Sequence, residues 1–171
     1  MGSINFFKMK GEILNSRKAN DLLEIIANQL GSDKKELKSM FAEYVFLLLG
    51  EGKVYLARKE AFSIELDELR INSIGVYLGT IEESGFRYSI EGAQKLSLFS
   101  TKNILLLNEE QAKLWMKGED ITGDFSKYDL YVILKYEDFI LGCGKNSNKK
   151  KRLINFTPKE RRITTDMPFL A

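Results

Sequence analysis

The chain has 171 residues, of which 44% are hydrophobic and 29% are charged, and its formal net charge is +2. This composition is typical of a globular protein and excludes a disordered chain; the length fits one ordinary domain or two small ones. The sequence contains no histidine, which excludes Ser-His-Asp and Cys-His catalysis and the usual zinc and haem ligands. It also contains no Gly-rich phosphate loop or dinucleotide fingerprint. We therefore expect no catalytic residues, no metal site and no cofactor.

The single cysteine, Cys143, excludes an intramolecular disulfide and fits a reducing compartment. No apolar run approaches the length of a membrane span, and the N-terminus lacks the layout of a signal peptide. We therefore expect a cytoplasmic protein without a membrane partner.

The first half of the sequence predicts alternating helices and strand pairs. Ser16 is placed to cap a helix over residues 17–30 that ends at Gly31, and Asp33 is placed to cap the next helix. Gly-rich turns join two pairs of apolar runs, which predict two β-hairpins. The expected elements are strands at 44–49, 53–57, 75–81 and 86–89, and helices at 60–69 and 90–98.

Residues 99–102 are the best candidate for a domain boundary, because a new apolar strand begins at Asn103. Asn108 then caps a helix that Gly118 ends, and residues 119–127 read as a polar loop. The remaining apolar runs predict three further strands, the last of which Pro158 terminates. These runs are residues 128–134, 139–143 and 153–156.

The stretch after Gly142 is a predicted hairpin with an unusual charge. Eight of the residues from Lys145 to Arg162 are basic and only Glu160 is acidic, so this window carries +7 while the rest of the chain sums to −5. Such asymmetry indicates a polyanionic partner. The alternative is that the basic tip is an ordinary solvated hairpin end.

Four motifs of the second half resemble the PUA-like RNA-binding domain at the C-terminus of Sun-type ribosomal RNA cytosine-C5 methyltransferases. They are Leu-Leu-Leu-Asn-Glu-Glu-Gln-Ala-Lys-Leu-Trp-Met-Lys-Gly-Glu-Asp-Ile, Tyr-Val-Ile-Leu-Lys, Phe-Ile-Leu-Gly-Cys-Gly-Lys and Leu-Ile-Asn-Phe-Thr-Pro-Lys-Glu-Arg-Arg-Ile. With the preceding strand pair, the resemblance covers residues 74–163. The order of elements also resembles ribosome-biogenesis factors of the pre-PUA plus PUA type.

These resemblances imply an α+β fold in which a pre-PUA α/β domain precedes a small PUA-like β-barrel. The implied divisions are residues 1–98, residues 99–165 and a loose tail at 166–171. Neither the Rossmann-like cofactor site nor the nucleophilic cysteine motif of the methyltransferases has a counterpart here. We therefore expect a chain that is not an enzyme, and a fragment beginning near Thr101 that folds alone with marginal stability.

The candidate RNA-binding residues are basic side chains, two strand glycines and one asparagine. Gly142 and Gly144 mark either a β-bulge or a close approach of RNA, and Trp115 either seals the barrel or touches a ligand. Phe156 is more typical of a core residue than of a base-stacking platform, and Arg87 has no assigned role. The candidates are Lys113, Lys117, Gly142, Gly144, Lys145, Lys149, Lys150, Lys151, Arg152, Asn155, Lys159, Arg161 and Arg162.

Two functions from different classes fit these observations. The first is a non-catalytic RNA-binding protein for structured rRNA or tRNA, acting in ribosome biogenesis or RNA modification. The second is an adaptor whose basic face docks onto an RNA methyltransferase or a pre-ribosomal protein.

Overall fold

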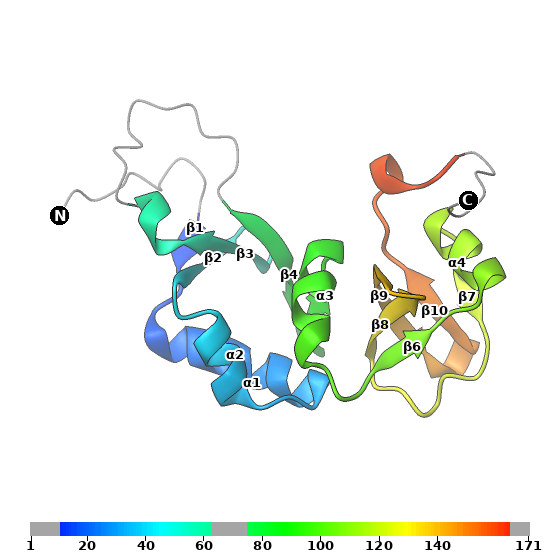
Figure 1. The fold of residues 1–171 in the computed structure, drawn as a ribbon, viewed down its shortest axis with the longest axis horizontal. Helices are drawn as coiled ribbons and strands as arrows, with labels where there is room; N and C mark the ends of the chain where they lie inside the picture. The colour runs from blue at the N-terminus through cyan, green and yellow to red at the C-terminus, as the bar shows by residue number, and fades with distance from the viewer. Residues whose placement is uncertain (1–10, 63–74, 165–171) are drawn as a thin grey trace.

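The computed structural model describes residues 11–62 and 75–164, which form two five-stranded sheets with a short helix between them (Figure 1). The first sheet is an antiparallel meander whose strands follow one another in space as they do in sequence. Its strands are β1 (Gly11–Ile13), β2 (Tyr44–Leu49), β3 (Lys53–Arg58), β4 (Val76–Glu82) and β5 (Gly85–Tyr88).

Helices α1 (Ser16–Leu30) and α2 (Lys34–Met40) lie along one side of this sheet (Figure 1). Gly31 ends α1 in the left-handed conformation, and Asp33 caps α2, as predicted. The predicted cap of α1 is one residue too late. Asn15 has the extended backbone of an N-cap and its side chain accepts the Lys18 N–H at 3.0 Å, so Ser16 is already helical.

The second sheet curls into a half-barrel in the order β6-β8-β9-β10-β7. β6 pairs with β8 in parallel, and the other neighbours are antiparallel. Helix α4 (Glu109–Met116) begins with a capping box between Asn108 and Gln111. The strands are β6 (Ile104–Leu106), β7 (Ile121–Thr122), β8 (Tyr131–Tyr136), β9 (Phe139–Ser147) and β10 (Arg152–Asn155).

The predicted hairpin is confirmed as β9, the turn η4 (Asn148–Lys150) and β10. The predicted loop at 119–127 is wrong in one detail, because it contains β7. Ile121 of β7 pairs with Leu153 of β10, and both are buried. Burial of that one apolar side chain stabilises a strand too short to stand out in the sequence.

Two hydrophobic clusters hold the sheets together. The first is built mainly from α1, α2 and the first sheet, but it also includes Tyr131, Ile133 and Cys143 of the second sheet. The second fills the curled sheet beneath α4 and includes Trp115, Leu134 and Leu153. Helix α3 (Ile90–Leu96), followed by the turn η3 (Ser97–Phe99), contacts both β4 and β9.

The expected α+β class is confirmed. The helix predicted at 60–69 begins as the 3-10 turn η2 (Lys59–Phe62), and the rest of that segment lies outside the described residues, as does the predicted tail at 166–171. None of the helices within 11–62 and 75–164 combines the length and hydrophobicity needed to cross a bilayer.

Candidate nucleic-acid interface

The tip of the β9–β10 hairpin presents accessible positive charge at the end of the second sheet. Lys149, Lys150 and Lys151, which we name the hairpin-tip cluster, are all exposed. Lys149 and Lys150 lie in the turn η4, and Lys151 adopts the left-handed conformation (φ 46°) that turns the chain into β10. Within the described residues, Lys149 and Lys150 form no ion pair. Their charge is therefore available to a ligand.

Two other basic candidates of this hairpin are already paired inside the protein. Arg152 forms an ion pair with Asp120 at 3.0 Å, and Lys145 forms one with Glu82 of β4 at 3.2 Å. Glu82 also accepts hydrogen bonds from Arg87 and from the Tyr131 hydroxyl. These contacts join the second sheet to the first.

The ionisation of Glu82 follows from these partners. Partial burial alone would raise the pKa of Glu82, but the hydrogen bonds from Tyr131, Arg87 and Lys145 outweigh it and lower the pKa to about 2. The same hydrogen bond raises the pKa of Lys145 above its ordinary value. Both side chains are therefore charged throughout the physiological range.

The three basic residues after Pro158 have different surroundings. Lys159 is exposed at the start of the turn η5 (Lys159–Arg161). Arg161 forms an ion pair with Glu91 of α3. The Arg162 Nε donates to the Thr157 carbonyl at 3.0 Å. The same side chain lies over Gly118, where a Cβ would lie 2.3 Å from the Nε. Only Lys159 among these three is free of such an internal contact in the described part of the chain.

The glycine and asparagine candidates have packing partners of their own. A β-bulge interrupts the β8–β9 register beside Gly142, which confirms the bulge interpretation. A Cβ at Gly144 would lie 3.0 Å from the Trp115 ring, so glycine lets the ring pack closely against β9. Asn155 donates to the carbonyls of Trp115 and Glu119 at 2.7 and 3.0 Å and accepts the Thr157 N–H at 2.7 Å.

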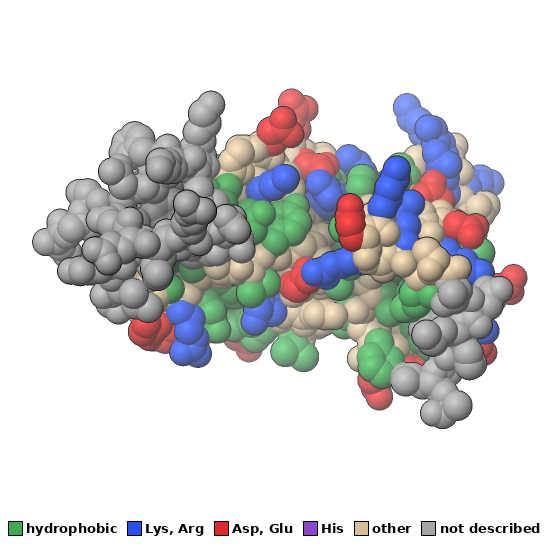
Figure 2. All heavy atoms as spheres, turned by 90° about the horizontal axis from the view of Figure 1, so that it is seen from above, with side chains coloured by type: hydrophobic (Ala, Val, Ile, Leu, Met, Phe, Trp, Pro, Cys, Tyr) green, Lys and Arg blue, Asp and Glu red, His purple; other side chains and the backbone are tan. Residues whose placement is uncertain are grey.

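The two lysines of helix α4 lie at its C-terminal end. Lys113 pairs with Glu109 one turn earlier at 2.6 Å. Lys117 is the exposed C-cap residue. In Figure 2, Lys and Arg side chains gather over the end of the molecule that carries the second sheet and extend towards its middle, where they border exposed hydrophobic side chains.

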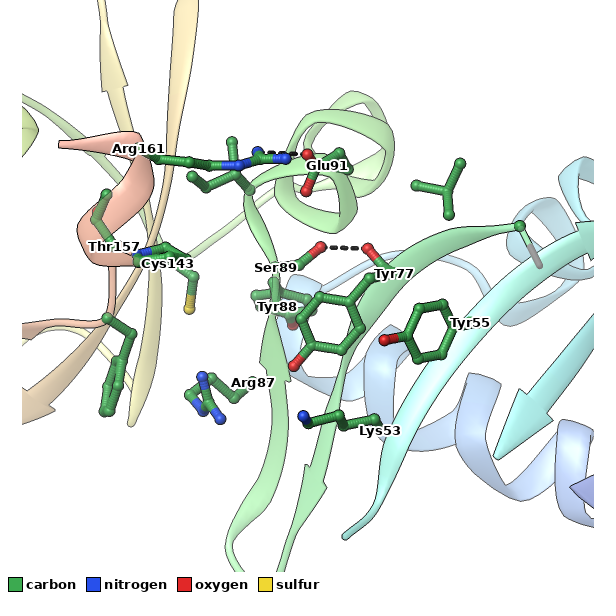
Figure 3. A pocket seen from close by; sticks show the side chains of 15 residues that line it. Lys53, Tyr55, Tyr77, Arg87, Tyr88, Ser89, Glu91, Cys143, Thr157 and Arg161 are labelled. Carbon is green, nitrogen blue, oxygen red and sulfur yellow. Dashed lines mark hydrogen bonds and ion pairs between the residues drawn. The ribbon is translucent and has the colours of Figure 1, made fainter. Parts of the chain in front are cut away.

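That middle region is a groove of about 630 Å³ between the first sheet and the segment that follows β10. Its lining includes Tyr55 and Tyr77, whose ring centroids lie 5.3 Å apart (Figure 3), and three cations. The sequence reasoning missed this groove, although Lys53 and Tyr55 alternate with buried residues along β3. That alternation is the signal of an accessible sheet face. The cations are Lys53, Arg87 and Arg161.

The burial of Trp115, Cys143 and Phe156 decides between a packing role and a ligand-binding role for each. Trp115 is 1% exposed and seals the curled sheet, and Cys143 is buried, which raises the pKa of its thiol to about 12. The prediction that Phe156 is a core residue is wrong. Phe156 is 38% exposed, lines the groove, and its ring lies 4.7 Å from the Arg87 guanidinium.

Among residues 11–62 and 75–164, no group of three or more Cys, Asp and Glu side chains is arranged to hold a metal ion.

Comparison with known proteins matches residues 102–163 to the family described as the methyltransferase RsmF PUA domain. The ribosomal RNA small subunit methyltransferase F of Vibrio cholerae is 29% identical over 86 residues, which cover 50% of this chain and 18% of that protein. The same-named protein of Aliivibrio fischeri is 30% identical over 95 residues, 56% of this chain and 20% of that protein. The chain thus spans about a fifth of the relatives' length. Residues 102–163 therefore form a PUA-like domain that resembles the one of Sun-type ribosomal RNA methyltransferases.

Proposed function

We propose that this chain is a non-catalytic, cytoplasmic RNA-binding protein that recognises structured rRNA or tRNA in ribosome biogenesis or RNA modification. The observation that carries the proposal is the hairpin-tip cluster, which lies inside the PUA-like segment. Because Lys149 and Lys150 have no ion pair within the described residues, a phosphate binds them without breaking an internal contact. The relatives, which are named as ribosomal RNA methyltransferases, favour rRNA as the RNA.

Within this proposal the two parts of the chain have different tasks. Residues 99–165 hold the RNA, and residues 1–98 form the pre-PUA-like domain that supports them. The contact between Glu82 and Lys145 fits this division, since it ties the hairpin to the first sheet away from the tip. The candidate RNA contacts are then the hairpin-tip cluster and Lys159.

Neutralising the tip tests the proposal. Replacing Lys149 and Lys150 by Gln should weaken binding of a small-subunit rRNA fragment and of bulk tRNA, because two phosphate contacts are lost. In a salt titration followed by fluorescence anisotropy, the slope of log K against log salt should fall by about 0.7 to 0.9 per lost contact.

The matched control replaces Lys35 and Lys38 on α2 by Gln. These lysines are also exposed, and their replacement removes the same charge. This variant should keep the parent's slope within about 0.3. If both variants weaken binding equally, the attraction comes from net charge and the tip is not the site. If the parent binds neither RNA, the adaptor function takes its place.

The non-catalytic part of the proposal predicts that the chain does not bind S-adenosylmethionine. The matched family describes a PUA domain, and the chain has no histidine to act as a general base. Isothermal titration calorimetry checks this expectation directly. Saturable binding of the cofactor would contradict it.

A further inference from the structure

The groove on the first sheet has the composition of a nucleotide site. Resting on the proposed RNA-binding function, we infer that this groove holds an unpaired nucleotide of the bound RNA, with its base against Tyr55 and Tyr77 and its phosphate beside Lys53. One wall of the groove belongs to the first sheet, which precedes the PUA-like segment. The other wall belongs to residues inside that segment. The groove therefore extends the interface from the hairpin onto the first sheet.

The aromatic wall follows from the register of the sheet. Along β3, Val54 and Leu56 are buried, so Lys53 and Tyr55 lie on the opposite face. A bulge in the β3–β4 pairing brings Tyr77 directly opposite Tyr55. Both rings are partly exposed and tilted by 41°, which leaves ring surface open to the groove (Figure 3). Aromatic pairs of this kind are stacking platforms for bases of any type.

The opposite wall supplies a third ring, Phe156, and one cation, Arg161. Phe156 is exposed and its ring lies beneath the guanidinium of Arg87. Arg161 reaches across the groove to Glu91 (Figure 3). Lys53 faces the groove with no ion pair among the described residues. Glu91 is the only acid among the described residues of the lining, and it is paired with Arg161. Arg87 is paired with Glu82, so Lys53 gives the described lining its net positive charge.

A nucleotide fits this arrangement better than an apolar or cationic ligand. A volume of about 630 Å³ lies within the usual range of small-molecule sites, about 300 to 1,000 Å³. The rings stack on the base, and the positive charge of the groove attracts the phosphate. A base paired in a duplex cannot enter between the walls, so the site requires an unpaired nucleotide.

The test removes the rings without emptying the groove. In the full chain, Tyr55 and Tyr77 are replaced by Leu, which keeps apolar volume, or by Phe, which keeps the stacking surface. Each variant is titrated with a short single-stranded RNA and with a fully paired RNA duplex of the same length. A Phe139→Leu variant serves as the control, because Phe139 is an exposed aromatic outside the groove.

The Leu variant should bind the single strand about 5- to 100-fold more weakly than the parent, while duplex binding changes less than about twofold. The Phe variant and the Phe139→Leu control should match the parent. If a folded Leu variant retains the parent's affinity for the single strand, the inference is overturned. The proposed function still stands in that case if replacing Lys149 and Lys150 weakens RNA binding. A parent that binds neither RNA overturns both.

Crosslinking supplies a measurement that does not depend on the folding of any variant. RNA that contains 4-thiouridine is irradiated in complex with the parent chain, and the adducts are mapped by mass spectrometry. Adducts at Tyr55, Tyr77 or Phe156 support the site. Adducts confined to the hairpin-tip cluster overturn it.

Discussion

The turn and the strands of the β9–β10 hairpin both carry basic residues, yet these residues differ in what their side chains contact. In the turn, Lys149 and Lys150 are exposed and form no ion pair within the described residues. In the strands, Lys145 and Arg152 are held by Glu82 and Asp120. Charge density in a sequence therefore overstates the charge available to RNA, because internal acids neutralise part of it. The basic residues of the strands support the fold, and those of the turn remain available to bind RNA.

The largest expected effect comes from removing the first sheet, on which Lys145 depends and the lysines of the turn do not. A fragment that begins at Thr101 exposes Tyr131, Ile133 and Cys143, which are buried in the shared cluster. We expect this fragment to fold with marginal stability, at least about 3 kcal/mol below the full chain, because several buried apolar side chains lose their cover. Urea unfolding of both chains measures the difference. Equal stability would mean that the halves are independent.

The next effect distinguishes two asparagines of the same hairpin. Asn155→Ala should lower the free energy of unfolding by about 2 to 3 kcal/mol, since it leaves three backbone groups without their partner. Asn148→Ala, at the exposed tip, should change it by less than about 0.5 kcal/mol. Thermal unfolding measures both. A stable Asn155→Ala variant that loses RNA affinity would instead make Asn155 a direct RNA contact.

The smallest effect is the pH dependence of stability that the contact between Glu82 and Lys145 produces. The pKa of Glu82 is about 2 in the folded protein and 4.5 ordinarily, so the unfolded state binds more protons between these values. The stabilisation from Glu82 is complete above about pH 5 and is lost as the pH falls to about 2, on the order of 2 kcal/mol. Denaturant unfolding across this range should show that loss.

A Glu82→Gln variant should flatten this part of the profile and be less stable at neutral pH, because Lys145 and Arg87 lose their carboxylate. Glu51→Gln, in an exposed turn of the first sheet, removes the same charge and should leave the profile unchanged. A profile that is identical in the parent and in Glu82→Gln would show that the junction contributes no stability.

Local signals in the sequence determined much of the fold. Gly31, Asp33 and Asn108 mark helix ends that the structure confirms, because caps and left-handed glycines act through neighbouring backbone groups. The strand pairs joined by tight turns are confirmed for the same reason. The motifs between residues 102 and 163 also sufficed to indicate the PUA-like domain.

Only the tertiary structure decided which candidate residues are accessible. Lys145 and Glu82 are separated by 63 positions, and Arg161 meets Glu91 across the two halves. The groove likewise needs Tyr55, Tyr77 and Phe156 from three separate segments. Ion pairing and ring stacking depend on distances of a few ångströms, and those distances are fixed by the packing of the two sheets rather than by any local pattern.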